Sequence, residues 1–270
     1  MEDRLIVTAS PHIREATTTR GLMGNVVIAL LPAVLAAGLI FGVQALVLVA
    51  VTTLACVAFE YLYEMLLKKP NTVGDLSAVV TGIILALNMP VSMPLWIAVV
   101  GAFVAIIITK QLFGGLGYNF ANPAIVGRIA MALGFTGAMT SYTYPENGID
   151  ALASATPLAV EETAQNAGSY VTLLLGNHGG VLGETCALTL LVGGLSLIAT
   201  KVISPTIPVT YLATVAVLSL VSGRDPIYQL LSGGLILGAF FMATDYVTSP
   251  STPKLSLIHI SEPTRLRRIS

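Results

Sequence analysis

The chain has 270 residues, of which 55% are hydrophobic and 10% are charged, and its formal net charge is −1. Soluble domains carry about 25% charged residues, so this composition, with a mean hydropathy of +0.85, indicates that lipid surrounds most of the chain. The near-neutral charge excludes a broad cationic surface for nucleic acid. Cys56 and Cys186 stand in apolar runs without the spacing of zinc or iron–sulfur sites. Because no nucleophile triad, phosphate loop or metal cluster is visible either, we expect no catalytic residue and no metal ligand.

The apolar segments predict an all-α, polytopic membrane protein. A helix needs about 20 apolar residues to cross a bilayer, and four segments are that long, while four more are shorter or interrupted by glycine and polar residues. Interrupted segments persist in a membrane only where other helices cover their backbone. We therefore predict eight spans, at 22–43, 45–67, 74–89, 95–113, 118–138, 185–203, 207–222 and 229–244.

These spans divide the chain into five regions. We expect a polar cytoplasmic lead at 1–21, a first half of five spans at 22–138, an extracytoplasmic loop at 139–184, and a partial second half of three spans at 185–254. The last stretch, 255–270, turns abruptly basic and resembles the translated read-through of a sequencing adapter, so we exclude it from the fold. The alternative is a native basic tail.

The charged residues orient the spans. Five lysines fall on the side of the N-terminus: Lys68, Lys69, Lys110, Lys201 and Lys254. The 139–184 loop contains acidic residues but no lysine or arginine. The excess of cationic residues in cytoplasmic loops therefore places the N-terminus in the cytoplasm and this loop outside, with Arg224 as the exception. His178 stands alone in the outer loop, and we expect it to be solvated.

A weak internal repeat is visible. The stretch TGIILALNMP (81–90) resembles SGGLILGAFFMATD (232–245), and each ends near a polar residue, Asn88 or Asp245. Interrupted segments paired between two halves are the pattern of an inverted repeat with a site at its centre. If each half has five spans, about eight of ten are present here and the second half is truncated. Chance similarity between two glycine-bearing apolar segments is the alternative.

Several stretches together resemble the RnfD/NqrB family of membrane subunits. They are SPHIR (10–14), GDLSAVVTGIILALNMP (74–90), KQLFGGLGYNFANPAIVGR (110–128), GETCALTLLVGG (183–194) and LLSGGLILGAFFMATDYVTSPSTPK (230–254). The resemblance covers nearly all of residues 5–254, and the short N-terminal lead is similar to the RnfD branch. It implies two inverted five-helix halves, in a complex that passes electrons between ferredoxin or NADH and an acceptor while moving Na⁺ or H⁺.

The resemblance also implies a covalent flavin. Family members carry FMN joined through its phosphate to a threonine hydroxyl on the outer side, in a motif that runs from Asp to Thr and ends Ser-Gly-Ala-Thr. In the matching run, Asp150, Ala155 and Thr156 agree with the motif, while Ala153 and Ser154 depart from Ser and Gly. Both departures are small residues that still allow a flavin transferase to approach. The resemblance thus assigns FMN to Thr156, and an ordinary loop threonine is the alternative.

The glycine-rich run GGLGYNFANP (114–123) stands at a span boundary. Gly114 and Gly115 allow tight turns and close approach to a ligand, while Asn119 and Asn122 offer donors and acceptors at membrane depth. The resemblance implies that this run lies near the attached flavin or near a second, non-covalent flavin such as riboflavin. The alternative is a re-entrant turn whose asparagines cap backbone groups.

Three charged residues have open alternatives, and a fourth has a single expected role. Arg128, inside the fifth span, either holds a flavin phosphate or extends to the cytoplasmic headgroups. Glu60 and Glu64 either form an i,i+4 ladder with Lys68 or belong to an ion path. Asp75 is expected to cap the helix that follows it.

The sequence therefore predicts a membrane flavoprotein subunit of an ion-translocating ferredoxin:NAD oxidoreductase in the bacterial cytoplasmic (inner) membrane. The expected partners are the other subunits of that complex, a flavin transferase and membrane lipid. A channel or secondary transporter of the same inverted-repeat fold, or a scaffold for redox neighbours, is the competing interpretation. The Asp150–Thr156 motif discriminates between them, because a simple channel has no need of it.

Overall fold

A computed structural model describes residues 18–143, 153–154, 170–176, 178–184 and 186–249. In the first part of the chain the helices are α1 (Thr19–Phe41), α2 (Val43–Leu66), the 3₁₀-helix η1 (Val73–Asp75), α3 (Ser77–Leu87), α4 (Leu95–Phe103), the π-helix η2 (Val104–Gln111), α5 (Pro123–Gly134) and α6 (Thr136–Met139). The later ones are α8 (Tyr170–Leu175), α9 (Ala187–Ala199), α10 (Thr206–Val221), α11 (Pro226–Leu231), α12 (Leu235–Leu237) and the π-helix η3 (Gly238–Met242).

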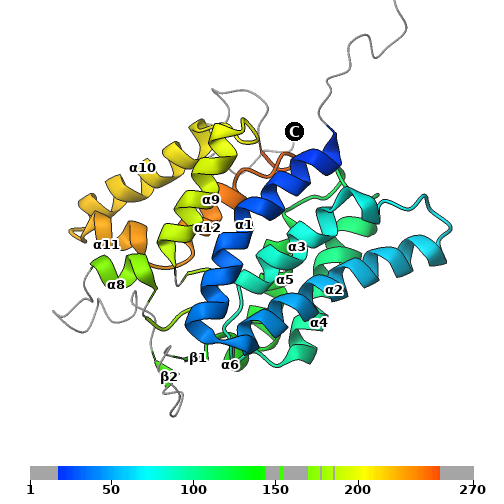
Figure 1. The fold of residues 1–270 in the computed structure, drawn as a ribbon, viewed down its shortest axis with the longest axis horizontal. Coiled ribbons are helices and arrows are strands. Elements are labelled where there is room, and N and C mark those ends of the chain that lie inside the picture. Colours follow the sequence, from blue (N-terminus) through cyan, green and yellow to red (C-terminus); the bar gives the residue numbers. More distant parts are fainter. Residues whose placement is uncertain (1–17, 144–152, 155–169, 177, 185, 250–270) are drawn as a thin grey trace, which may run out of the picture.

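The helical class predicted from the sequence is confirmed, with one small correction. Two strands, β1 (Tyr142–Thr143) and β2 (Ala153–Ser154), pair antiparallel, with Tyr142 opposite Ser154. In Figure 1 this pair lies with α6 at the lower end of the molecule, near the turn between α1 and α2, whereas α1 begins at the upper end. The pairing fixes the backbone of Ala153 and Ser154, in the middle of the predicted attachment motif.

Local chemistry sets the helix boundaries. Gly42 separates α1 from α2 with φ 78°, a left-handed value that glycine adopts without strain. Asp75 Oδ1 accepts the Ser77 N–H at 2.7 Å, which confirms the cap expected before α3. Asn122 caps α5, and Pro123 occupies the first helical position, where no N–H is required.

Helices occupy all eight segments that the sequence marks as apolar, but most are shorter than a full span. Within the described residues, α1 and α2 are long and apolar enough to cross a membrane. Five further apolar helices have 10–17 residues: Ser77–Leu87, Leu95–Gln111, Pro123–Gly134, Ala187–Ala199 and Thr206–Val221. In the predicted span 118–138 the helix begins only at Pro123, because the glycine-rich turn comes first. The predicted span 229–244 is interrupted at Gly233, whose φ is 69°.

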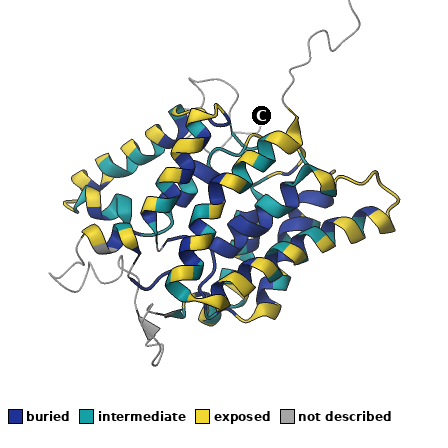
Figure 2. Cartoon of the chain, in the orientation of Figure 1, coloured by how far each residue is buried: buried dark blue, intermediate teal, exposed yellow. Residues whose placement is uncertain are grey.

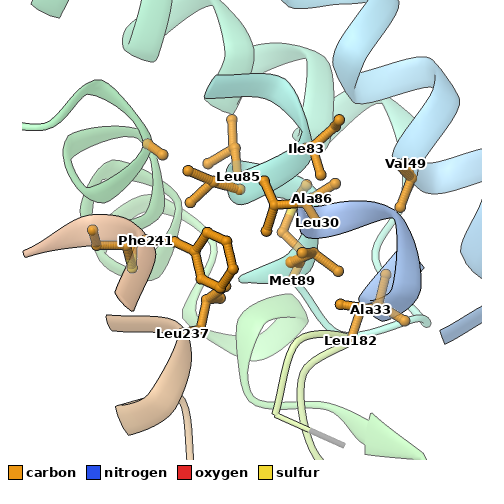
Figure 3. Close-up of a cluster of buried hydrophobic side chains, with 14 of the residues drawn as sticks. Leu30, Ala33, Val49, Ile83, Leu85, Ala86, Met89, Leu182, Leu237 and Phe241 are labelled. Atoms are coloured by element: carbon orange, nitrogen blue, oxygen red, sulfur yellow. The ribbon is translucent and has the colours of Figure 1, made fainter. Parts of the chain in front are cut away.

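The core sits where the two parts of the chain meet. Leu30 of α1 and Met89, just beyond α3, face Leu182, Leu237 and Phe241 from the later part of the chain (Figure 3). At the α1–α9 crossing, a methyl group on Gly193 would lie 2.1 Å from the Ala29 carbonyl oxygen. Small residues let helix backbones approach this closely in membrane proteins.

The outer faces of the helices are apolar. Figure 2 shows exposed residues along the outward sides of α2 and α10, whereas α3, in the interior, is mostly buried. Leu39, Leu133 and Val221 are exposed by 87%, 81% and 81%. Apolar surface spread over so many helices is far more than a soluble monomer exposes. Lipid is the solvent that such a surface fits.

Candidate functional site

The glycine-rich run folds as a tight turn between η2 and α5. Gly114, Gly115 and Gly117 have φ values of 121°, 97° and 95°, a region that residues with a side chain rarely adopt. The Gly115 N–H donates to the Lys110 carbonyl at 3.0 Å and so closes the end of η2. The turn therefore returns the chain directly to Asn119 and the start of α5.

Both asparagines of this run satisfy backbone groups, as the re-entrant alternative predicts. Asn122 Oδ1 accepts the Ala124 N–H at 3.0 Å, and its Nδ2 donates to the Met242 carbonyl of η3 at 3.4 Å. Asn119 Nδ2 donates to the Ala121 carbonyl at 3.0 Å. Asn122 therefore ties the first half of the chain to the second.

The same asparagines also line a cavity of about 90 Å³, here called the inner pocket. Its walls are mainly apolar, with Val80, Ile84, Leu197, Phe240 and Phe241 among them. Asn119, Asn122 and Asp245 supply polar groups, and Asp245 also forms a hydrogen bond with the Asn119 side chain. Apolar walls with a few convergent polar groups are typical of a small-molecule site. Gly114 and Gly115 line a neighbouring, wider pocket of about 820 Å³ together with Glu64 and Asp75.

Beside the inner pocket lies a set of polar residues, most of them buried, here called the inner network: Glu60, Glu64, Thr72, Asp75, Ser77, Lys110 and Gln111. Lys110 Nζ lies 2.7 Å and 2.9 Å from the two Glu60 oxygens and 2.6 Å from Ser77 Oγ. Gln111 Nε2 donates to Glu60 Oε1 at 3.1 Å. The exposed fractions of Lys110 and Glu60 are 2% and 0%.

The inner network bears on two expectations. Three oxygen acceptors hold the Lys110 ammonium inside the protein, and the side of the membrane on which Lys110 lies stays a prediction. Glu64 accepts the backbone N–H of Thr72 at 3.0 Å and the Thr72 hydroxyl as well. Among the described hydrogen bonds and ion pairs, the glutamates therefore bind Lys110 and Thr72 in place of the predicted ladder with Lys68.

A second group of polar residues, here called the outer cluster, lies beyond the end of α3: Asn88, Arg128, Tyr142, His178 and Glu184. Arg128 Nη1 donates to Asn88 Oδ1 at 2.9 Å, and Asn88 Nδ2 donates to the Ile84 carbonyl at 2.7 Å. A methyl group on Gly234 would lie 3.4 Å from Glu184 Oε1 and 3.9 Å from Arg128 Nη1. Arg128 is therefore held inside the protein at the end of α3, and the expectation that it extends to cytoplasmic headgroups is wrong.

Backbone hydrogen bonds fix the loop that carries His178 and Glu184. The Leu182 N–H donates to the Met89 carbonyl at 3.0 Å, and the Gly183 N–H donates to the Leu87 carbonyl at 2.7 Å. His178 is 5% exposed, which contradicts the solvated position expected for it. Its Nδ1 lies 3.3 Å from the Gly179 carbonyl, and its Nε2 has no hydrogen-bond partner among the described residues.

Burial shifts the protonation of three groups in the outer cluster. It lowers the pKa of His178, and it raises the pKa of Glu184 against the opposing charge of Arg128. The pKa of Tyr142 is also raised, first by burial and then by the charge of Glu184, while Arg128 opposes the shift. Tyr142 of β1 therefore lies within electrostatic reach of both charged side chains.

The predicted site residues separate into two groups at opposite ends of α5. Gly114, Gly115, Asn119 and Asn122 precede this helix of 12 residues, which is about 18 Å long at 1.5 Å per residue. The attachment motif follows its other end, where Ser154 lies in β2 opposite Tyr142. Three further motif residues fall outside the described part of the chain: Asp150, Ala155 and Thr156.

The family of the chain follows from a comparison with known proteins. A family model described as the NQR2, RnfD, RnfE family matches residues 6–259. The chain belongs to the NQR2, RnfD, RnfE family. This confirms the resemblance found in the sequence, and the match ends inside the 255–270 stretch that we excluded from the fold.

Named relatives agree with this family. The chain is 49% identical to a subunit of the Na⁺-translocating ferredoxin:NAD⁺ oxidoreductase complex of Acetobacterium woodii, with 96% of this chain and 82% of the relative covered. It is 37% identical to the corresponding subunit of the proton-translocating complex of Clostridium ljungdahlii, with 93% and 82% covered. It is 35% identical to a subunit of the ion-translocating oxidoreductase complex of Rhodobacter capsulatus, with 90% and 79% covered.

Proposed function

We propose that this chain is the flavin-bearing membrane subunit of an ion-translocating ferredoxin:NAD⁺ oxidoreductase complex. In this proposal FMN is joined through its phosphate to the Thr156 hydroxyl, on the extracytoplasmic side of the membrane. The flavin supplies the electron-transfer chemistry, and the protein supplies its position and its electrostatic surroundings. The other subunits of the complex, a flavin transferase and membrane lipid are the partners.

The observation that carries the proposal is the attachment motif together with its position beyond the end of α5 that lies opposite the glycine-rich run. The names of three relatives support membership in such a complex. The pairing of β2 with β1 also supports the proposal, because it fixes the backbone of Ser154, two residues before Thr156. A tethered cofactor needs no bimolecular search for its place, and this favours efficient electron transfer.

The inner pocket carries side chains suited to a second, non-covalent flavin such as riboflavin, but its cavity of about 90 Å³ is smaller than the roughly 300 Å³ at which small-molecule sites begin, so its walls would have to move apart to admit the ring. Phe240 and Phe241 offer ring surfaces for stacking. Asn119 and Asn122 offer amide donors and acceptors, and Asp245 adds a carboxylate. The inner pocket and the attachment motif lie at opposite ends of α5, so two flavins placed there would form successive positions across the membrane.

Coupling to Na⁺ or H⁺ movement follows from charge balance. An electron added to a group buried in lipid brings an unpaired negative charge into a medium of low dielectric constant, which is costly. A cation that moves with the electron lowers this cost. The contact between α3 and η3, through the Asn88 amide and Met242 sulfur, supports the proposal of two repeats that meet at the centre.

The attachment is tested by expressing the full chain with its flavin transferase and recording flavin fluorescence on a denaturing gel. We expect a fluorescent band from the unmodified sequence and a dark band from Thr156→Ala. Thr163→Ala, which removes another threonine of the same loop, is the matched control and should stay fluorescent. The mass of the tryptic peptide that contains Thr156 should increase by that of FMN less one water, because the phosphate ester replaces the hydroxyl hydrogen.

The competing functions give different results. A channel, transporter or scaffold without a redox role predicts a dark band from the unmodified sequence. Labelling that places the Thr156 peptide in the cytoplasm would contradict the proposed side of the membrane.

A further inference from the structure

The cavity of about 820 Å³ beside the glycine-rich turn, here called the wide pocket, is large enough for a ligand. Small-molecule sites have volumes of about 300–1,000 Å³. The walls of the wide pocket come from three places in the chain: the start of α1, the loop between α2 and α3, and the turn at Gly114 and Gly115. The function proposed above makes no use of this cavity.

Hydrogen bonds fix the loop that forms one wall of the wide pocket. Glu64, near the end of α2, accepts both the backbone N–H of Thr72, at 3.0 Å, and the Thr72 hydroxyl. Asp75 Oδ1 accepts the Ser77 N–H at 2.7 Å, which joins the far end of the loop to α3. The loop is therefore held at both ends, and the cavity is a defined part of the fold.

The charged groups that line the wide pocket are paired unequally. Arg20 and Lys69 are exposed, and neither takes part in an ion pair among the residues that the structure describes. Glu64 is buried and uses both carboxylate oxygens for Thr72. Asp75 uses Oδ1 for the start of α3, and no hydrogen bond to its Oδ2 is described. Two cations and one carboxylate oxygen are thus available to a ligand that carries both an anionic group and an ammonium group.

The wide pocket lies where membrane headgroups are expected. α1 begins at Thr19 and α2 ends at Leu66, and residues at both of these ends line the pocket. Both helices are long and apolar enough to cross a membrane, so their ends reach the polar edge of the bilayer. Beside the pocket, Met65, Leu66 and Leu67 are exposed by 55%, 75% and 53%. This apolar surface fits acyl chains, which favours a lipid over a soluble ligand.

We propose that the wide pocket binds the headgroup of a phospholipid that carries a primary ammonium group, as phosphatidylethanolamine does. The lipid phosphate faces Arg20 and Lys69, and the lipid ammonium donates to Asp75. Cationic side chains at the end of membrane helices attract lipid phosphate, and hydrogen bonds between charged groups add geometric selectivity. The bound lipid connects the first turn of α1 to the loop between α2 and α3.

The experiment is a lipid titration of the full chain, purified in detergent and freed of lipid, followed by native mass spectrometry. The dissociation constant of the first bound lipid is measured for phosphatidylethanolamine and for phosphatidylcholine with the same acyl chains. Phosphatidylcholine has the same charges, but its trimethylated nitrogen has no N–H to donate. We expect phosphatidylethanolamine to bind about tenfold more tightly, because only its ammonium forms a hydrogen bond with a carboxylate.

Variants test the two ends of the headgroup separately. Arg20→Gln/Lys69→Gln should weaken the binding of phosphatidylethanolamine by about tenfold or more, since both cations near the phosphate are removed. Lys68→Gln/Lys201→Gln is the matched control: it removes the same charge from two exposed lysines that do not line the pocket, and should leave the affinity unchanged. Asp75→Asn retains a capping oxygen for α3 and should remove the preference for phosphatidylethanolamine over phosphatidylcholine.

Three results would overturn the proposal. The first is equal affinity of the wild type for the two lipids. The second is an equal loss in both double variants, which would indicate a general attraction of lipid to surface cations. The third is displacement of the lipid by an equal concentration of inorganic phosphate, which would make free phosphate the ligand. If Arg20→Gln/Lys69→Gln does not fold, the comparison of the two lipids on the wild type and on Asp75→Asn decides in the same way.

Discussion

The inner network and the outer cluster are both polar groups inside an apolar protein, but they differ in how completely their members are paired. In the inner network Lys110 contacts three oxygens within 3 Å, and Glu60 accepts hydrogen bonds from the Lys110 and Gln111 side chains. In the outer cluster Arg128 has one described hydrogen bond, and His178 Nε2 has none.

This difference indicates which of the two polar groups contributes more to the stability of the protein. A buried charge pair with all its hydrogen bonds made is expensive to break, because the remaining partner is left as an uncompensated charge. A group that keeps free donors and acceptors loses less when one member is removed. We therefore expect the inner network to contribute more to the stability of the fold than the outer cluster does.

The largest effect is expected from Lys110→Met. This change leaves Glu60 buried and unpaired, and we expect it to destabilise the protein by about 3–5 kcal/mol. Unfolding in detergent can be followed by the fluorescence of Trp96, the single tryptophan of the chain, which packs against Phe135 with ring centroids 5.1 Å apart. Lys201→Met, which removes an exposed lysine, is the matched control and should change the stability little.

The double variant Glu60→Gln/Lys110→Met sharpens this test. Neutralising both partners removes the unpaired charge, so the double variant should be more stable than Lys110→Met alone. A double variant as unstable as the single one would show that packing of the Lys110 side chain, rather than its charge, stabilises this region.

A smaller effect is expected from Asn88→Ala in the outer cluster. The change removes the bond to Arg128 and the bond from Nδ2 to the Ile84 carbonyl, and should cost about 2 kcal/mol. Arg128 is only half-buried and can regain water, which limits the loss. The same Trp96 measurement applies, with Asn71→Ala, at an exposed turn position, as the control. A loss as large as that of Lys110→Met would remove the distinction between the two groups.

The positions of the helices could be read from the sequence because their signals are local. Asp75 and Asn122 cap helices that begin within two residues of them, and Gly42 ends α1 through its own backbone geometry. The capping function of Asn119 and Asn122 was one of the two alternatives for the same reason. Each of these features depends on neighbours in the chain.

The side-chain pairs could not be read from the sequence, because they depend on how the helices pack. Glu60 and Lys110 are 50 residues apart, and Asn88 and Arg128 are 40 residues apart. Lys68 was the nearer partner for the glutamates in sequence, but Lys110 is the one that packing brings to Glu60. His178 looked solvated because its burial depends on the backbone bonds from Leu182 and Gly183 to the end of α3.

The smallest expected effect is the pH dependence that His178 contributes to stability. Burial lowers its pKa in the folded protein, whereas in the unfolded chain the imidazole titrates near its usual value of about 6.5. As the pH falls through 6.5, the unfolded chain takes up a proton that the folded protein does not, so His178 lowers the stability on the acidic side. Between pH 7.5 and pH 5.5 this contribution is at most about 1.4 kcal/mol.

His178→Gln in a Thr156→Ala background isolates this contribution, because under the proposed function no flavin is then attached to the chain. Glu184 faces the same loop, and its pKa is raised by burial; its contribution therefore has the opposite sign, since the folded protein takes up that proton first. It is present with and without His178, so it cancels when the two stability curves are subtracted. The difference curve should rise below pH 6.5 in favour of His178→Gln. A flat difference curve would mean that His178 is protonated as readily in the fold as outside it, and that its Nε2 is open to water.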